Sequence, residues 1–450
     1  MYGQSRIVTL SDFHATKLNN DRTIYIYLPP NYEAGTEQRY PALYIHDGQN
    51  VFDESTSSSG VSWGLHKKAD DLIAKGKIPE ILIVAIEFKD RTKEFCYYSW
   101  DKKHIEWNEY ASFDYSIEGK GDEYADFIIH DLKPYIDHNF RTLPDKDNTA
   151  LMGASGGGFI TFNMGIRQPD IFGKLGIISP SFFAMDIDIL QRLSKQSLKM
   201  WFDVGQKEPC LLEDTVFVVE QMLSKGYQEG DELIYYQVPN GFHSEADWGK
   251  RADCHLIYFF GDIGKPIGAR LEGRTEIGML EKDVRINPIV QYDSGITRSD
   301  IRATYQIENP DILEIKPDGT IIPKSDGSTR IEYILGQIRV SQTYTIRKNL
   351  SSTVAITFMV EVPEDTPADA RIGVDTYSPM NLELKKESER LYKGTFHLDR
   401  GLDINYKIKM MNNFQLSIET DLELQEIPYR SLQVSEEKMV TCTVASWSRL

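Results

Sequence analysis

Up to about residue 260, short apolar runs alternate with longer segments in which apolar residues recur at helical spacing. The apolar runs are rich in β-branched and aromatic residues, and they predict strands at 23–28, 41–46, 81–87, 148–152, 174–178, 199–204 and 233–238. The intervening segments predict helices at 63–75, 124–138, 157–168, 212–226 and 245–260. Because several strands are apolar on both faces, the alternation predicts an α/β fold, with a mostly parallel sheet covered by helices on both faces.

After Gly261 the helical periodicity nearly disappears. Short alternating segments such as 338–346, 354–362 and 404–410 are separated by Gly-containing turn signals, which is typical of β-sandwich domains. The stretch Gly264-Lys-Pro-Ile-Gly268 resembles a linker, and 348–352 is a polar break. We therefore expect three domains: an α/β domain at 1–262, followed by two small all-β sandwich domains at 263–347 and 348–450.

The sharpest chemical signal is Gly153-Ala-Ser155-Gly-Gly157, a G-x-S-x-G motif between a predicted strand and a predicted helix. In that context the glycines permit a tight turn that exposes the Ser155 hydroxyl above the sheet. The N-terminal N–H groups of the following helix point at developing negative charge, so the Gly156 N–H is a candidate oxyanion donor. We interpret Ser155 as a nucleophile.

A serine nucleophile needs a base, and in this kind of fold the chain order is serine, acid, histidine. Three histidines follow Ser155. His255 lies inside an apolar helical run and His397 lies in the β-rich tail, whereas His243 follows the predicted strand 233–238 directly. Ligands of α/β sheets bind at the carboxyl ends of the strands, so we expect His243 to be the base.

The acid that orients the histidine should lie on the loop after the preceding strand, 199–204. Glu208 lies on that loop and is the first choice. Asp203 is a rival within the strand itself. Asp214 is a second rival near the start of the next helix, where a structural role is also available, because a negative charge near a helix N-terminus stabilises the helix.

The second oxyanion donor normally comes from the loop after the third strand, here His46-Asp47-Gly48-Gln49. We expect the Gln49 backbone N–H to be that donor. His46 and Asp47 could also suggest a metal site, but no third ligand stands at a metal-like spacing, so loop-shaping roles are favoured. We expect neither a metal nor a cofactor.

Composition narrows the function further. Lys plus Arg number 50 and Asp plus Glu 68, a net charge of −18, and this acidic surface without a basic patch argues against nucleic-acid binding. No apolar run approaches the roughly 18 residues of a membrane span. The four cysteines lack metal-like spacing; Cys210 and Cys254 could pair, although buried thiols are the simpler expectation.

Several motifs resemble the esterase D-like α/β-hydrolases: Tyr40-Pro-Ala-Leu-Tyr-Ile-His-Asp-Gly-Gln-Asn-Val-Phe52, Arg91-Thr-Lys-Glu94, Gly153-Ala-Ser-Gly-Gly-Gly158, Ile178-Ser-Pro-Ser181 and Gly241-Phe-His243. The resemblance runs from roughly residue 7 to 262. It implies an α/β-hydrolase domain that hydrolyses carboxylic esters. Carried over by position, the family's nucleophile falls on Ser155, its histidine on His243, its acid on Glu208, and its oxyanion amides on Gln49 and Gly156.

The β-rich tail shows fainter resemblances. Residues 283–346 resemble a bacterial immunoglobulin-like segment, and 348–450 resemble a starch-binding-type carbohydrate-binding β-sandwich. Modules of that type hold sugars on exposed tryptophans, and the only tryptophan after Gly261 is Trp447. A segment rich in aromatic residues follows the fourth predicted strand, before the tail. Its side chains could line a substrate pocket, or they could pack the loop onto the domain. The candidate substrate-binding residues are Tyr97, Tyr98, Trp100 and Trp107.

The sequence thus favours a serine esterase that removes acetyl or feruloyl groups from plant polysaccharide or a related carbohydrate. A siderophore esterase and an S-formylglutathione-type thioesterase are alternatives with the same machinery. An alternative of another class is a carbohydrate-binding scaffold whose hydrolase domain has lost activity. The appended β domains favour a periplasmic or secreted location, with a cytoplasmic one left open, and the oligomeric state is not predicted.

Overall fold

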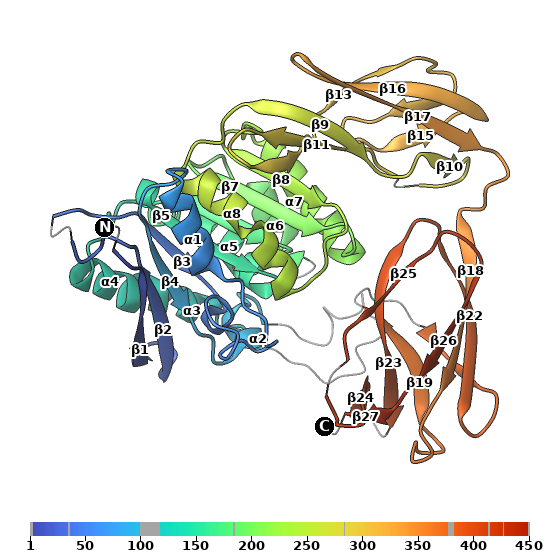
Figure 1. The fold of residues 1–450 in the computed structure, drawn as a ribbon, viewed down its shortest axis with the longest axis horizontal. Helices are drawn as coiled ribbons and strands as arrows, with labels where there is room; N and C mark the ends of the chain where they lie inside the picture. The colour runs from blue at the N-terminus through green and yellow to red at the C-terminus, as the bar shows by residue number, and fades with distance from the viewer. Residues whose placement is uncertain are drawn as a thin grey trace.

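The computed structural model describes residues 3–34, 37–99, 118–182, 185–282, 284–376, 382–412, 415–425 and 427–448. An N-terminal α/β part is followed by two β-rich parts, one beside the α/β part and one that carries the C-terminus (Figure 1). The α/β part carries all the predicted catalytic residues, so its sheet determines where they lie.

The central sheet has eight strands in the order β1-β2-β4-β3-β5-β6-β7-β8. The strands from β4 to β8 run parallel, and β1 and β2 are antiparallel at one edge. Their bounds are β1 Arg6–Ala15, β2 Asn20–Leu28, β3 Ala42–Ile45, β4 Leu82–Ile86, β5 Thr149–Ala154, β6 Lys174–Ile178, β7 Lys199–Gly205 and β8 Leu233–Val238. The predicted fold class is confirmed, with a mostly parallel sheet of the α/β-hydrolase type.

The sequence did not indicate β1. A bulge between Leu10 and Phe13, with Asp12 at a left-handed φ of 55°, interrupts the alternation of apolar and polar residues in this strand. Most of its side chains are exposed as well, because it lies at the edge of the sheet. The strand therefore lacks the apolar run that predicts the other seven strands.

Helices cover both faces of the sheet, as predicted (Figure 1). The main ones are α1 Leu65–Ala74, α3 Gly121–Asp126, α4 Lys133–Asn139, α5 Gly156–Arg167, α7 Pro209–Ser224 and α8 Glu245–Phe260, with short helices α2 Arg91–Glu94 and α6 Ile187–Arg192. Between α3 and α4 the chain forms a π-helix, η2 Phe127–Leu132, inside the predicted helix 124–138. The periodicity thus located the helical segment but not its changes of winding.

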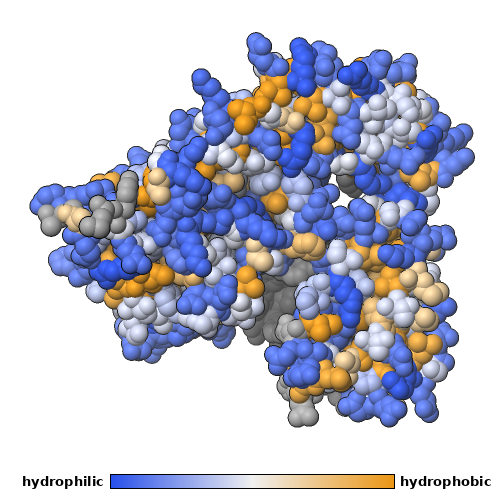
Figure 2. Space-filling view, in the orientation of Figure 1, coloured by the Kyte–Doolittle hydropathy of each residue, from blue (hydrophilic) through white to orange (hydrophobic). Residues whose placement is uncertain are grey.

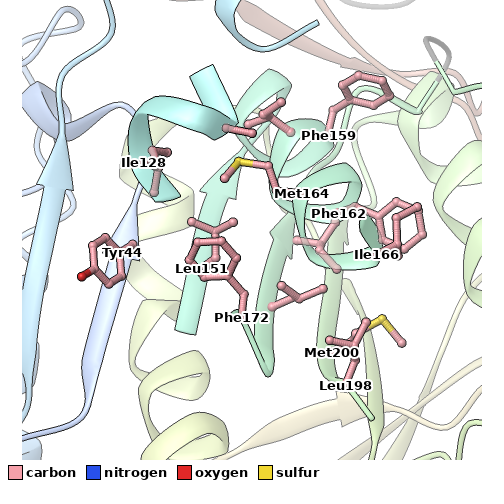
Figure 3. Close-up of a cluster of buried hydrophobic side chains, with 14 of the residues drawn as sticks. Tyr44, Ile128, Leu151, Phe159, Phe162, Met164, Ile166, Phe172, Leu198 and Met200 are labelled. Carbon is pink, nitrogen blue, oxygen red and sulfur yellow. The ribbon is translucent and has the colours of Figure 1, made fainter. Parts of the chain in front are cut away.

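Two hydrophobic cores fill the space between sheet and helices. One lies against α5 and η2 and includes Leu151 of β5, Phe162 of α5 and Met200 of β7 (Figure 3). The other is formed with α1 and α8. Successive side chains of a strand point to opposite faces of the sheet, so Tyr44 belongs to the first core and Leu43 to the second. This two-sided burial explains the nearly continuous apolar runs in the sequence.

The part that follows α8 packs directly on the α/β part. It contains β9 Pro266–Glu272, β10 Glu276–Gly278, β11 Asn287–Tyr292, β12 Thr297–Ser299, β13 Thr304–Ile307, β14 Leu313–Ile315, β15 Ile321–Pro323, β16 Gly327–Leu335 and β17 Ile338–Arg347. Val290, Tyr292, Ile296 and Tyr333 belong to the core formed with α1 and α8, and Ile301 belongs to the other core. The expected linker 264–268 is short in fact, since β9 already begins at Pro266.

Polar contacts also join these two parts. The backbone N–H of Gln237 in β8 donates to the Ser299 hydroxyl at 2.9 Å, and the Asn287 amide donates to the Gln237 carbonyl at 3.1 Å. Arg298 forms a buried ion pair with Glu229 at 2.8 Å. The β12 strand and its neighbours therefore cover the β8 edge of the central sheet.

The last part is a sandwich of two sheets around its own core. Its strands are β18 Thr353–Glu361, β19 Arg371–Thr376, β20 Leu382–Glu383, β21 Lys385–Lys386, β22 Leu391–Asp399, β23 Asp403–Asn412, β24 Gln415–Thr420, β25 Arg430–Gln433, β26 Lys438–Thr443 and β27 Ser446–Trp447. Trp447 belongs to this core and donates its indole N–H to Thr366 at 3.0 Å, so it is a packing residue rather than an exposed sugar platform.

The turn between β22 and β23 contacts the preceding β-rich part. Gly401, at φ 86°, lies against the Arg274 side chain, where an added Cβ would overlap with the guanidinium group. Burial raises the pKa of Asp403, and the charge of Lys207, on the loop that carries Glu208, counteracts this shift. The C-terminal sandwich therefore contacts the preceding β-rich part at Arg274, and Asp403 lies within electrostatic range of Lys207.

Hydrophilic residues predominate on the face shown in Figure 2, and apolar residues form small areas among them. Within the described residues, no helix is long and apolar enough to cross a membrane. Cys254 is a buried free thiol, and burial raises its pKa to about 12, so it is not half of the disulfide that the sequence left open.

Candidate active site

Ser155 occupies a sharp turn between β5 and α5. Its backbone has φ 60° and ψ −122°, a conformation that L-residues rarely adopt. The turn requires glycine on both sides, because a Cβ on Gly153 would lie 2.6 Å from the Gly157 carbonyl oxygen, and one on Gly158 would lie 2.8 Å from the Ile178 oxygen. The strained serine is held by its N–H, which donates to Ile178 at 2.9 Å.

His243 and Glu208 meet at the same end of the sheet. Nδ1 of His243, on the loop between β8 and α8, lies 3.0 Å from Oε1 of Glu208, on the loop between β7 and α7. The other carboxylate oxygen of Glu208 accepts the Gly205 N–H at 2.7 Å. The Glu208 side chain is fully buried and that of His243 is 9% exposed, so this pair is shielded from bulk water.

The rival acids lie elsewhere. Asp203 is buried in a separate network, where its two oxygens meet Arg251 at 2.7 Å and His255 at 2.8 Å and the Trp201 indole N–H donates to it at 2.9 Å. Burial alone would raise its pKa, but the charge of Arg251 and the hydrogen bonds from His255 and Arg251 hold it below the usual value. Asp203 and His255 thus support the framework.

The two other residues weighed in the sequence also lie apart from the His243–Glu208 pair. Asp214 lies within α7, and burial, followed by the charge of Glu213, raises its pKa. His397 lies in β22 of the C-terminal sandwich. Of the three histidines after Ser155, His243 is the one that contacts an acid on the loops at the carboxyl end of the sheet, the end that also carries the Ser155 turn.

The predicted oxyanion residues flank the same turn. Gln49 is buried in the short 3₁₀ helix η1, Gly48–Asn50, which follows β3, and Gly156 is the first residue of α5. Gly48 is needed where η1 crosses β4, since a Cβ there would lie 2.5 Å from the Ala85 carbonyl carbon. Because β3 and β5 are adjacent parallel strands, both segments lie at the same end of the sheet.

An Asp47–Arg91 pair holds the η1 loop in place. Asp47 has a left-handed φ of 55°, and its carboxylate binds Arg91 through two hydrogen bonds of 2.7 and 3.0 Å. The Arg91 guanidinium also donates to the Ala154 carbonyl at 3.2 Å, directly before the nucleophile. Sequence reasoning gave Arg91 no role, and its only signal was its place in the motif Arg91-Thr-Lys-Glu94.

The helix that carries Arg91 is itself anchored. Glu94, at the other end of α2, forms a buried pair with Arg22 of β2 at 2.9 Å. The Arg22 guanidinium lies over the Phe127 ring at 4.6 Å from its centroid. A chain of contacts from the antiparallel edge of the sheet therefore fixes the loop that carries Gln49.

His46 is a buried neutral imidazole rather than a metal ligand. Its Nδ1 lies 2.9 Å from the Tyr124 hydroxyl, and burial, followed by the charge of Arg91, lowers its pKa to about 3. Within the part of the chain that the structure describes, no group of three His, Cys, Asp or Glu side chains is arranged to hold a metal ion.

Two of the four predicted substrate-binding aromatics are described, and they pack against the core at the side of α5. Arg167 lies over the Tyr97 ring at 4.4 Å from its centroid, and the Tyr98 hydroxyl lies 3.5 Å from the Asn163 side-chain oxygen. Trp100 and Trp107 lie outside the described residues. A role in substrate binding stays a prediction for all four.

Ser181 is a further polar neighbour of the nucleophile. Its hydroxyl oxygen lies 3.4 Å from that of Ser155, and its N–H donates to the Ser155 carbonyl at 3.2 Å. The sequence marked this residue only as part of Ile178-Ser-Pro-Ser181. The structure thus adds the loop after β6 to the loops that surround Ser155.

Comparisons with known proteins find similar sequences and structures for the α/β part. The family model described as "Putative esterase" matches residues 15–257. The uncharacterized protein YbbA of Bacillus subtilis is 24% identical over 252 residues, 54% of this chain and 93% of that protein. An endo-1,4-beta-xylanase/feruloyl esterase of Xylanibacter ruminicola is 33% identical over 166 residues, which cover 35% of this chain but 19% of that protein.

Solved structures of similar fold include a ferulic acid esterase, with a TM-score of 0.44 and 22% identity over 57% of this chain and 98% of that chain. Another is an enterobactin esterase from Shigella flexneri, with a TM-score of 0.43 and 16% identity over 56% of this chain and 59% of that chain.

Proposed function

Because the chain belongs to the putative esterase family and is an ester-hydrolysing enzyme, we propose that it is a serine esterase whose triad is Ser155, His243 and Glu208. The observation that carries this proposal is the buried 3.0 Å contact between His243 and Glu208 beside the strained Ser155 turn. A buried acid on Nδ1 fixes the imidazole so that Nε2 is the nitrogen that takes up a proton.

Acylation follows from these roles. The Ser155 oxygen forms a bond to the ester carbonyl carbon while its proton moves to Nε2 of His243. The carbonyl oxygen becomes an oxyanion, which the backbone N–H groups of Gln49 and Gly156 would stabilise. Collapse of this intermediate breaks the bond to the alcohol oxygen, and the imidazolium returns its proton to the departing alcohol, leaving an acyl-enzyme.

Deacylation repeats the sequence with water. The water loses a proton to His243 as it attacks the acyl carbon, and the same oxyanion site receives the charge. Breaking the bond to Ser155 then releases the carboxylic acid, and the proton on His243 returns to the serine oxygen. Glu208 stays ionised throughout and stabilises the imidazolium.

For the substrate, we propose an acetyl or feruloyl ester of a plant polysaccharide or related carbohydrate. Two facts support this: the relative of 33% identity is named as a xylanase/feruloyl esterase, and two β-rich parts follow the hydrolase part. The same reasoning favours a periplasmic or secreted enzyme. A siderophore esterase is the second candidate, since an enterobactin esterase is among the proteins of similar fold.

The test combines a labelling reaction with a substrate panel. A fluorophosphonate probe should label the wild-type protein at Ser155 and should not label Ser155→Ala. Turnover should fall on the order of 10⁶-fold in Ser155→Ala, with an unchanged circular dichroism spectrum. A protein that resists the probe at Ser155 would instead be the inactive carbohydrate-binding scaffold.

The panel then assigns the substrate class. Hydrolysis rates would be compared for acetylated xylan, a feruloylated arabino-oligosaccharide, enterobactin and S-formylglutathione. We expect the two carbohydrate esters to give the highest kcat/KM. A preference of more than tenfold for enterobactin or for the thioester would overturn the substrate assignment and leave the triad standing.

A further inference from the structure

Trp248 lies directly beside the imidazole of His243. Their ring centroids are 4.8 Å apart and their planes are at 82°, an edge-to-face arrangement. Trp248 is the fourth residue of α8 and is 6% exposed, so its side chain is held in place by packing. Glu208 holds one nitrogen of the imidazole, and Trp248 restricts the rotation of its ring plane.

The indole is oriented by a second residue, Ser179. The indole N–H of Trp248 donates to the Ser179 hydroxyl at 3.1 Å, and the Arg251 guanidinium donates to the same oxygen at 3.2 Å. Ser179 is fully buried and directly follows β6. Its hydroxyl is thus an acceptor for two donors that have no access to bulk water.

Ser179 also adopts an unusual backbone conformation. Its φ of 41° is in the left-handed region, which is unfavourable for a residue with a Cβ. Glycine would relieve that strain but would remove the hydroxyl. The N–H of Ser179 donates to the Asp203 carbonyl at 2.7 Å, which ties this position to β7, the strand that leads to Glu208. Strain kept at a buried polar residue is typical of functional sites.

The same loop contacts the nucleophile. The carbonyl of Ile178 accepts the Ser155 N–H, and the N–H of Ser181 donates to the Ser155 carbonyl. The segment 178–181 therefore contacts the nucleophile through its backbone and reaches the base through the Ser179 hydroxyl and Trp248. A shift of this segment would change the distance between the two.

We propose that Trp248 and Ser179 are positioning residues that hold His243 in line with Ser155. The proposal rests on the serine-esterase function proposed above. Neither side chain needs to touch the substrate, so both should act on the rate of the chemical step and leave substrate binding nearly unchanged. Misplacement of a catalytic group by about 1 Å can cost on the order of 10²-fold in rate.

The test uses Trp248→Phe, which keeps an aromatic ring but loses the N–H donor, and Ser179→Gly, which suits the left-handed backbone but loses the acceptor. Trp63→Phe is the matched control, because Trp63 is equally buried and lies 5.9 Å from Trp248 in the same core. The readouts are kcat and KM on p-nitrophenyl acetate, the rate of fluorophosphonate labelling, and Tm, all with the full-length chain.

We expect Trp248→Phe and Ser179→Gly to lower kcat and the labelling rate about 10- to 100-fold, with KM within about twofold. The losses in the double variant should be smaller than the sum of the two single losses, because both substitutions remove the Trp248–Ser179 hydrogen bond. Trp63→Phe should lower Tm by about as much as Trp248→Phe does, with kcat nearly unchanged.

Two results would overturn the inference: a kcat in Trp248→Phe equal to that of Trp63→Phe, or losses that simply add in the double variant. The underlying function is tested separately. If Ser155→Ala keeps its activity, the serine-esterase proposal fails; if Ser155→Ala is inactive while Trp248→Phe is fully active, only the positioning role fails.

Discussion

A deletion after residue 263 tests how far the hydrolase part depends on the strands that follow it. The predicted catalytic residues all lie before this cut, and the sequence places a domain boundary at 262. However, five apolar side chains beyond the cut belong to the two cores of the hydrolase part: Val290, Tyr292, Ile296, Ile301 and Tyr333.

The magnitude follows from burial. Each of these side chains contributes about 1.5 kcal/mol, the low end of the usual range, because part of its surface also packs within its own part of the chain. Together they give about 7.5 kcal/mol, before the Arg298–Glu229 pair and the contacts to Gln237 are considered. Native proteins are stable by only about 5–15 kcal/mol, so the fragment 1–263 should be largely unfolded or aggregated at 25 °C.

The matched fragment ends at residue 350, after β17 and before β18, and keeps all five side chains. We expect fragment 1–350 to unfold cooperatively in urea and to hydrolyse p-nitrophenyl acetate, whereas fragment 1–263 should do neither. Urea unfolding followed by circular dichroism, together with an esterase assay, compares the two. Equal urea midpoints and equal activity for both fragments would refute the reasoning and would support 1–262 as an autonomous domain.

Three further predictions concern the site. Glu208→Gln should lower kcat by about 10³–10⁴-fold in an ester-hydrolysis assay, because it weakens the fixed orientation of the imidazole, while Asp214→Asn should have no such effect. Arg91→Lys cannot form the bidentate pair with Asp47 that fixes the oxyanion loop, so kcat should fall by up to about 10²-fold. The control Lys93→Ala, on the same helix, should keep a kcat near that of the wild type. An equal loss of kcat in both variants would contradict the role of Arg91. Burial lowers the pKa of His46 to about 3 from its ordinary 6.5, so the stability that its neutral form gives is intact above pH 6.5 and is lost as the pH falls towards 3. Between pH 7.5 and 4.5, urea unfolding should show a loss of stability on the order of 2–3 kcal/mol greater in the wild type than in His46→Gln, and equal losses would contradict a buried neutral imidazole.

The sequence predicted the parallel sheet well, because strands buried on both faces carry nearly continuous apolar runs and the helices between them carry a clear period. It also singled out the three residues proposed as the triad, since chain order and strand ends restrict where a base and an acid can lie. The structure brings Glu208 and His243 to 3.0 Å from each other, and their catalytic roles stay a proposal.

Other features had no local signal. The pairs Arg91–Asp47 and Arg22–Glu94 join residues far apart in the chain, and a charged residue in an exposed-looking segment gives no sign of its partner. The left-handed Ser179 was hidden for a similar reason, because serine is not the residue that such a conformation usually selects. The packing of Tyr292 and Ile296 on the hydrolase core is likewise a property of tertiary contact, which alternation within a strand does not encode.

The turn between β22 and β23 bears on how the C-terminal sandwich would act on a polymer. A binding module on a long flexible linker raises the local concentration of substrate, and its benefit depends on linker length. Here five residues separate β17 from β18, and Gly401 of the turn contacts Arg274. Asp403, which follows the turn, is within electrostatic range of Lys207, on the loop after β7. The short connection and the Gly401–Arg274 contact therefore hold the sandwich against the preceding β-rich part, so it is not a freely tethered anchor, and lengthening the connection at 348–352 would release this contact rather than extend the reach of a module.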